Sequence, residues 1–351
     1  MGVLWSSVAS SADGSRLVAA ARAGLIYTST NSGTDWVPSP LPSLQWRSVA
    51  CSADGTKLVA AAYFGPIYSS TNSGANWISN NAPNLTWASV ACSGDGSTFA
   101  AVVYGGRVYT CPTSGITWVA HAATDAWDSI ASSADGSKMV ASVANGPVCT
   151  STNSGVAWSQ TSAPQTNWAG VASSGDGTKL AAVGGGSAGA GPIYTSTNGG
   201  VTWTPVSVAA GPWSSIAASM DGTKLVVVAY GGPILTSTNF GGQWTSNRAP
   251  SDYWSAVAAS ADGGNLVAAI SPGPVFSTRP VVALELAATG TGTDVVLSWP
   301  WTSAGFFLQQ SSELATTHWA SLPATPALNG WQNQVRLPAS NHQTFYRLQL
   351  P

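Results

Sequence analysis

Short hydrophobic runs and polar turns alternate along residues 1–280, and the same order of runs and turns recurs at a regular spacing. In residues 46–83 the pattern predicts four strands, which we name A to D in chain order: 46–52, 57–62, 66–71 and a short strand around Trp77. Apolar runs of about four to eight residues bounded by Gly, Pro, Asn and Ser are typical of strands and short for helices. The sequence therefore predicts an all-β region built from four-stranded units.

Each of the seven units opens with a tryptophan that is followed by small and apolar residues. The steps between these opening tryptophans are 41, 41, 40, 41, 45 and 41 residues, and the residues are Trp5, Trp46, Trp87, Trp127, Trp168, Trp213 and Trp254. A period of about 40 to 45 residues with four short strands per unit indicates the blades of a β-propeller. We therefore predict a seven-bladed β-propeller in residues 1–280.

Two turns recur in these units. The turn between strands A and B carries an Asp-Gly pair in every copy, which provides side-chain acceptors and a residue that tolerates positive φ. The turn between strands C and D reads Ser-Thr-Asn-x-Gly-x-x-Trp in five copies, for example Ser70 to Trp77. This spacing resembles the Asp-box, or BNR, repeat, with Asn at the usual Asp position. The resemblance implies the fold of sialidase-like and sortilin-like proteins and leaves the activity open, because Asp-box hairpins occur in enzymes, receptors and assembly factors alike.

The seventh unit and the end of the chain depart from the pattern. The seventh unit has strands A, B and C at 254–260, 265–270 and 274–278 but no C-to-D turn, so we expect a three-stranded blade or one completed by a short piece of a chain terminus. Residues 281–351 contain six short alternating runs, the first at 281–286, and predict a small antiparallel β-sandwich. This module resembles the immunoglobulin-like or fibronectin-like C-terminal modules of secreted repeat proteins.

Composition restricts the partners. Charged residues make up only 7% of the 351-residue chain, and 12 basic and 14 acidic side chains give a net charge of −2. No apolar stretch approaches the length of a membrane helix, so we expect no nucleic-acid partner and no membrane insertion. A surface rich in Ser, Thr, Asn and Gly suggests a secreted, extracellular protein, although residues 1–5 lack the features of a signal peptide. We also expect a monomer.

The four cysteines are expected to be free thiols. Cys51 and Cys92 occupy one position of consecutive units, where other units have Ser or Ala, so the position requires a small residue. Cys111 and Cys149 belong to neighbouring blades, where the Cα separation is expected to exceed the limit of roughly 7 Å for a disulfide. No cysteine is close to a histidine in the sequence, and we predict neither a metal site nor a cofactor.

The residues of sialidase catalysis are missing from the predicted propeller. The resemblance to Asp-box enzymes would imply three clustered arginines, a Tyr-Glu pair and an Asp acid. The only glutamates of the chain, Glu285 and Glu313, lie in the C-terminal module. The sialidase mechanism is therefore excluded.

A glycosidase of another type needs two carboxylates at about 5 to 9.5 Å. Apart from the A-to-B turns and Asp35, the propeller has few acidic residues, and His121 lies near two of them. We interpret the segment with His121, Asp125 and Asp128 as a loop that enters the fourth blade. The catalytic candidates are Asp125, Asp128, Asp252 and His121. The alternative is that these residues only decorate solvated loops.

Ligands are expected on the face that carries the B-to-C turns and the D-to-A connections. Variable residues concentrate there, including Arg22, and several are aromatic. Aromatic rings with a polar edge are suited to stacking on sugars. The predicted ligand-binding residues are Arg47, Tyr63, Phe64, Tyr104, Trp127, Asp128 and Tyr230. For the opening tryptophans, Trp127 included, the alternative is packing between blades, since buried aromatic residues dominate the cores of repeat proteins.

These observations predict a secreted, non-catalytic recognition or scaffold protein that binds a glycan or a cell-surface protein. One alternative is an unrecognised carbohydrate-active enzyme, a glycosidase or lyase, that uses Asp125, Asp128 or Asp252. The other is a purely structural extracellular repeat protein.

Overall fold

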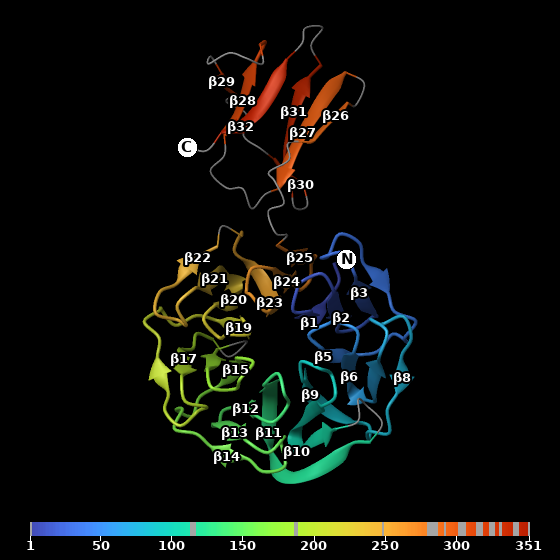
Figure 1. The fold of residues 1–351 in the computed structure, drawn as a ribbon, viewed down its shortest axis with the longest axis vertical. Coiled ribbons are helices and arrows are strands. Elements are labelled where there is room, and N and C mark those ends of the chain that lie inside the picture. Colours follow the sequence, from blue (N-terminus) through green and yellow to red (C-terminus); the bar gives the residue numbers. More distant parts are fainter. Residues whose placement is uncertain are drawn as a thin grey trace. The chain divides into compact units, whose positions relative to one another are not determined.

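The computed structural model of the chain consists of β-strands and connecting turns in the parts that it describes (Figure 1). These parts are residues 2–112, 117–185, 189–247, 249–278, 287–290, 293–300, 307–313, 319–322, 327–329, 332–339 and 344–349. The chain divides into two compact units, Met1–Arg279 and Pro280–Pro351. No helix in the described residues could span a membrane. The strand predicted at 281–286 lies outside the described residues.

Each sequence repeat of the first unit contributes a small antiparallel sheet with strand A innermost. Repeat 1 contains β1 (Trp5–Ser10), β2 (Leu17–Ala21), β3 (Ile26–Ser29) and β4 (Val37–Pro38), and repeat 2 contains β5 (Trp46–Cys51), β6 (Leu58–Gly65), β7 (Ile67–Ser70) and β8 (Ile78–Ser79). Repeats 3 and 4 share β9 (Leu85–Cys92), β10 (Phe99–Cys111), β11 (Val119–Ser132), β12 (Met139–Val143), β13 (Val148–Ser151) and β14 (Ser159–Gln160). Repeat 5 contains β15 (Trp168–Ser173), β16 (Leu180–Gly184), β17 (Ile193–Ser196) and β18 (Thr204–Pro205), and repeat 6 contains β19 (Trp213–Ala218), β20 (Leu225–Gly232), β21 (Ile234–Ser237) and β22 (Thr245–Ser246). Repeat 7 has three described strands, β23 (Asp252–Ala259), β24 (Leu266–Ile270) and β25 (Val275–Ser277).

The inner strands form a closed ring, which confirms the predicted all-β propeller (Figure 1). Each inner strand contacts the next one, and β23 contacts β1. Seven backbone hydrogen bonds of 2.7 Å follow the same ring on the side of the A-to-B turns. In each bond an amide donates to the carbonyl of the next repeat, through Ala12, Ala53, Gly94, Ala134, Gly175, Met220, Ala261 and back to Ala12. The first and last repeats are therefore joined in the same way as the others.

Neighbouring repeats are also joined on the opposite side. The turn between strands B and C pairs with the chain that enters the next repeat, as Tyr63 pairs with Thr86. These bridges join the sheets of repeats 2, 3 and 4 into one 10-stranded sheet, although each repeat keeps its own antiparallel strands. At the last junction Val3 pairs with Gly273, and the indole of Trp5 donates to the carbonyl of Gly273 at 2.8 Å. The N-terminal segment thus closes the ring at this turn.

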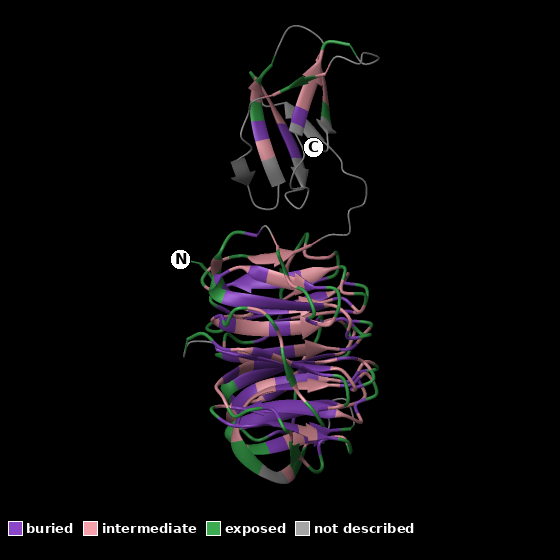
Figure 2. Cartoon of the chain, turned by 90° about the vertical axis from the view of Figure 1, so that its left-hand side faces the viewer, coloured by how far each residue is buried: buried purple, intermediate pink, exposed green. Residues whose placement is uncertain are grey.

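The opening tryptophans are all buried. Trp87 is 0% exposed and packs with Val59 and Ile67 of repeat 2 and with Phe99 and Val103 of repeat 3. The propeller strands are largely buried, and the exposed residues concentrate in the connecting segments (Figure 2). Since no single sheet can bury both of its apolar faces, the repeats are stable only as a stack.

The A-to-B turns contain a repeated polar network. In repeat 2 the buried Ser52 hydroxyl donates to Asp54 and accepts the amide of Lys57 at 3.0 Å, while Asp54 accepts the amide of Thr56 at 3.0 Å. In six of these aspartates the pKa is lowered to about 2. The hydrogen bond from the serine hydroxyl is the largest cause, and the hydrogen bond from the backbone amide is the second. The pKa of the seventh, Asp262, is lowered by the same contacts. Hydrogen bonds to the charged form favour ionisation, so these carboxylates serve the turns.

The C-to-D hairpins are held by a serine and an asparagine. In repeat 2 the Ser70 hydroxyl accepts the amide of Gly74 at 2.9 Å and donates to the Asn72 carbonyl oxygen at 3.0 Å, which accepts the amide of Asn76 at 2.8 Å. The same contacts occur in repeats 1, 4, 5 and 6. Part of the divergent hairpin of repeat 3, residues 113–116, lies outside the described residues.

Side chains three residues after the turn aspartates connect one A-to-B turn to the next. Lys57 donates from Nζ to the carbonyl of Asp95 at 2.8 Å, and equivalent bonds start from Arg16, Lys138, Lys179, Lys224 and Asn265. Repeat 3 has Thr98 at this position, which is too short to reach the carbonyl of Asp135. The junction between repeats 3 and 4 therefore lacks this connection.

Replacing Thr98 with lysine is expected to supply the missing bond and to raise the free energy of unfolding by about 0.5 kcal/mol, the size typical of an exposed charged contact. Thermal denaturation of Thr98→Lys and Thr98→Met measures the effect, because methionine has a similar length without the ammonium group. Equal transition temperatures for the two variants would contradict the expected role of the ammonium group.

The second unit contains two antiparallel sheets. One has the order β26 (Ala287–Gly290), β27 (Asp294–Pro300), β31 (Gln332–Pro338) and β30 (Ala327–Asn329). The other has the order β29 (Ala320–Ser321), β28 (Phe307–Ser311) and β32 (Phe345–Gln349). Leu297 and Val335 of the first sheet share one buried cluster with Leu308 of the second, so the two sheets pack face to face.

Candidate functional site

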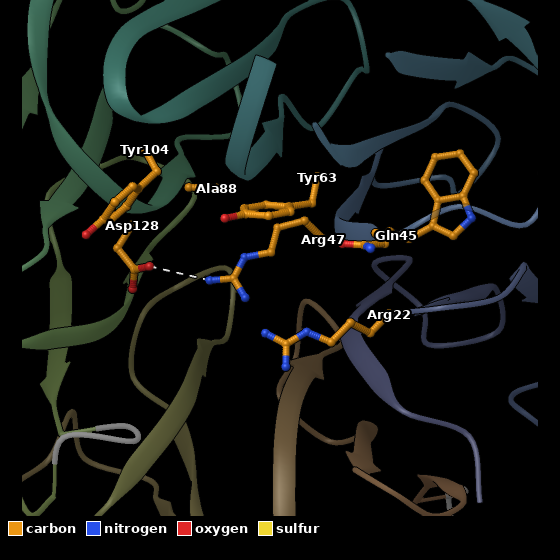
Figure 3. Close-up of a pocket in the computed structure, with 8 residues that line it drawn as sticks. Arg22, Gln45, Arg47, Tyr63, Ala88, Tyr104 and Asp128 are labelled. Atoms are coloured by element: carbon orange, nitrogen blue, oxygen red, sulfur yellow. Dashed lines mark ion pairs between the residues drawn. The ribbon is translucent and has the colours of Figure 1, made fainter. Parts of the chain in front are cut away.

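A cavity of about 390 Å³ lies among the first four repeats, at the ends where the B-to-C turns are found (Figure 3). The residues that line it are Arg22, Gln45, Trp46, Arg47, Tyr63, Ala88, Tyr104 and Asp128. The residues that line it are polar, small or aromatic, and one of them, Trp46, is fully buried. A cavity with aromatic walls and a few convergent polar groups is typical of small-molecule sites.

Two positions of the repeat build most of this cavity. Arg22, Tyr63 and Tyr104 each stand 17 residues after the opening tryptophan of repeats 1, 2 and 3. The remaining repeats have Ala144, Gly185, Tyr230 and Ser271 at this position. The residue after the opening tryptophan is Arg47, Ala88 and Asp128 in repeats 2, 3 and 4, and Ser6, Ala169, Ser214 and Ser255 elsewhere. The charged and aromatic residues thus occur at equivalent positions of consecutive repeats.

The backbone holds the first of these positions independently of its side chain. The amide of Tyr63 donates to the carbonyl of Gln45 at 2.7 Å, and the amide of Arg22 donates to Leu4 at 2.6 Å. Gly185 and Ser271 make the same bond to Asn167 and Tyr253, at 2.9 Å each. The turn therefore keeps this backbone hydrogen bond whether the residue is Arg, Tyr, Gly or Ser.

Arg47 and Asp128, which both line the cavity, form an ion pair. Arg47 Nη2 lies 3.6 Å from Asp128 Oδ1, and both side chains are partly exposed (Figure 3). Burial raises the pKa of Asp128, and the Arg47 guanidinium offsets part of this rise. Within the described residues Arg22 has no ion pair. Two arginines and one aspartate leave the cavity with a net charge of +1 when Asp128 is ionised, in a chain whose net charge is −2.

The structure brings together four of the predicted ligand-binding residues, Arg47, Tyr63, Tyr104 and Asp128. Phe64 does not line this cavity; its ring lies 4.4 Å from that of Tyr63 and its side chain is 70% exposed. Tyr230 forms a separate exposed pair with Tyr253, with ring centroids 4.9 Å apart.

The structure corrects the interpretation of Trp127 as a ligand-binding residue. Its side chain is 2% exposed and packs with Ile130 and Trp158, so it has no surface to offer a ligand. The alternative of packing between blades accounts for its position, as it does for the other opening tryptophans.

The segment with His121, Asp125 and Asp128 is also different from the prediction. It belongs to one continuous strand, β11, and not to a loop, because it pairs with the long strand β10. His121 Nε2 lies 2.7 Å from Thr110 Oγ1, and burial lowers the pKa of His121. Asp125 accepts the amide of Ala126 at 2.8 Å and does not line the cavity.

Asp252, the remaining catalytic candidate, accepts the amide of Tyr253 at 2.7 Å in β23 and does not line the cavity either. Among the described residues that line this cavity, Asp128 is therefore the only carboxylate. Gln45 and Ala88 were not expected at the site, and Arg22 was recognised only as a variable turn residue. The alignment of Arg22 with Tyr63 in the repeats is the signal that could have assigned it.

The described residues contain no assembled site for metal or thiol chemistry. No group of three His, Cys, Asp or Glu side chains there could hold a metal ion. The four cysteines are free thiols. Burial raises the pKa of Cys51 to about 12 and that of Cys149 to about 11, which keeps both thiols protonated at neutral pH.

Solved structures with a similar fold are β-propellers. The GH74 enzyme of Niastella koreensis is similar over 99% of this chain and 71% of that protein, with a TM-score of 0.66 and 12% identity. YCF48 of Cyanidioschyzon merolae is similar over 80% of this chain and 97% of that protein (TM-score 0.62, 14% identity), and so is hydrazine synthase of Kuenenia stuttgartiensis over 80% and 97% (TM-score 0.66, 15% identity). No family model and no curated protein matches the sequence. The chain is thus an all-β propeller. Because the sequence identities are low, the similarity to these structures shows the fold alone.

Proposed function

We propose that this chain is an extracellular, non-catalytic recognition propeller that binds carbohydrate in the cavity between Arg22 and Asp128. The observation that carries the proposal is the convergence of Tyr63 and Tyr104 with Arg47 and Asp128 around one cavity. Tyrosine rings stack on the C–H faces of sugars, and charged and amide groups bind hydroxyls. The serine-asparagine hairpins support assignment of the repeats to the Asp-box type.

Binding is better supported than hydrolysis. One similar fold belongs to a GH74 enzyme, so a carbohydrate-active enzyme is the competing function. Glycoside hydrolysis needs two carboxylates on either side of the scissile bond. Of the described lining residues only Asp128 is a carboxylate, and it faces the Arg47 guanidinium.

A protein partner is the second candidate. YCF48, another similar fold, is described in a structure bound to the D1 peptide. The polar walls of the cavity, with no aliphatic side chain larger than Ala88, favour a sugar over a peptide side chain.

Replacing Tyr63 and Tyr104 with alanine is expected to weaken glycan binding by about tenfold or more, because both stacking surfaces are lost. A glycan array followed by calorimetry on the best ligand measures this effect. Both tyrosines are exposed, and repeat 4 already has an alanine, Ala144, at the equivalent position. We therefore expect the melting temperature to stay unchanged.

Tyr230→Ala is the matched control, since Tyr230 has the same repeat position but lies outside the cavity. Equal loss of binding in this control would place the site elsewhere. Absence of binding to every glycan on the array would remove the carbohydrate proposal altogether.

A further inference from the structure

We infer that the cavity recognises a sugar that carries a carboxylate, such as a hexuronate unit of an acidic polysaccharide. This inference rests on the proposed carbohydrate-binding function and specifies its ligand class. It depends on three features of the cavity: an arginine without an ion pair, a second arginine already oriented by an aspartate, and two tyrosines beside them.

Arg22 is the cation available to a ligand. Its guanidinium extends toward the cavity, in the same direction as the guanidinium of Arg47 (Figure 3). Its backbone amide is anchored to Leu4 at 2.6 Å, and within the described residues its side chain has no carboxylate partner. A guanidinium offers two parallel N–H groups that match the two oxygens of a carboxylate.

Arg47 is positioned by Asp128. The ion pair uses Nη2 of Arg47, whereas a guanidinium has five N–H donors. The pair therefore orients Arg47 without using all of its donors. With one aspartate against two arginines, the cavity keeps one positive charge that a single ligand carboxylate would neutralise.

Tyr63 and Tyr104 supply the surface for the sugar ring. Their side chains are 39% and 54% exposed, and both line the same cavity as the arginines. A hexuronate combines a ring with apolar C–H faces and a carboxylate at the ring edge, so it would contact the tyrosines and the arginines at the same time. A neutral sugar would leave the charge of Arg22 uncompensated.

Isothermal titration calorimetry of the full chain with tetragalacturonate and with its fully methyl-esterified form tests the inference. Esterification keeps the ring and linkage and removes the charge. We expect the acid to bind at least tenfold more tightly than the ester, with a difference that shrinks at high salt. Arg22→Ser, which places the residue of repeat 7 at this turn, should lower affinity for the acid about tenfold and leave the ester unaffected.

A further variant separates local recognition from bulk charge. Arg107→Ser removes the same charge from an exposed residue that does not line the cavity, and it should leave affinity for the acid unchanged.

The outcomes distinguish the inference from the proposed function. If acid and ester bind equally and Tyr63→Ala weakens both, carbohydrate binding stands and the carboxylate inference is wrong. Equal effects of Arg22→Ser and Arg107→Ser would also overturn it. If neither sugar nor any array glycan binds, both fail. Arg22-dependent binding of a tetrapeptide with a free carboxyl terminus, without binding of the sugar acid, would replace the sugar by a peptide.

Discussion

Trp87→Ala is expected to lower the free energy of unfolding by about 3 to 5 kcal/mol. Trp87 is 0% exposed, its indole donates to the Gly65 carbonyl at 3.0 Å, and its ring lies edge-on to Tyr109 at 5.1 Å. The substitution removes the largest fully buried side chain between repeats 2 and 3 and leaves a cavity that rigid strands cannot fill. Because the repeats depend on their interfaces, the loss affects the whole ring. Guanidinium denaturation followed by tryptophan circular dichroism measures it.

Two other variants make this prediction specific. Tyr104→Ala removes a ring that is 54% exposed and should change the free energy of unfolding by less than about 0.5 kcal/mol. Trp87→Phe keeps an aromatic ring but loses the bond to Gly65, and should cost about 1 to 2 kcal/mol even if the alanine variant does not fold. If Trp87→Ala destabilised the protein no more than Tyr104→Ala, the packing role of the opening tryptophans would be wrong.

Acidification is expected to destabilise the propeller between about pH 4 and pH 2. In the folded state the pKa of each of six A-to-B turn aspartates is about 2, whereas that of an unfolded aspartate is about 3.9. The native state therefore binds fewer protons in this range, so the stability from these carboxylates is complete above about pH 4 and is lost as the pH falls through 2. Since the carboxylates are exposed, we expect about 0.5 to 1 kcal/mol for each turn.

Asp54→Asn tests this assignment at a single turn. Asp54 accepts bonds from the Ser52 hydroxyl, the Thr56 amide and the Thr56 hydroxyl. The variant should be less stable than the wild type at pH 7 and approach it near pH 2, as measured by denaturant titration at each pH. Asp252→Asn, outside these turns, should leave the acid transition unchanged; a parallel shift in both variants would show that net charge, and not the turn network, controls it.

The repeat pattern was sufficient to predict the propeller and the strands of its regular repeats. Trp, Asp-Gly and the serine-asparagine hairpin recur at the same spacing, and each has a local physical role. Strand β11 escaped prediction because its first half, Val119–Asp125, has no alternating pattern of its own and is extended only through pairing with Arg107 and Tyr109. Long-range pairing of this kind overrides local preference.

The candidate site was only partly predictable for a related reason. Trp127 and Asp128 are consecutive in the sequence, and the repeat pattern does not say which side chain packs against the neighbouring blade. In the structure Trp127 is buried in the core, whereas Asp128 lines the cavity. The Arg47–Asp128 pair joins repeats 2 and 4 across Ala88, and its formation depends on the curvature of the ring. A one-dimensional pattern does not contain that curvature.

The backbone anchor of the B-to-C turn has a consequence for specificity. Since the amide of this residue is bound whichever side chain it carries, the propeller separates the residues that maintain its architecture from those that meet a ligand. Arginine, tyrosine, alanine, glycine and serine already occupy this site in different repeats. Single substitutions at this position can therefore change what the propeller binds, in evolution or in the laboratory, without changing its scaffold.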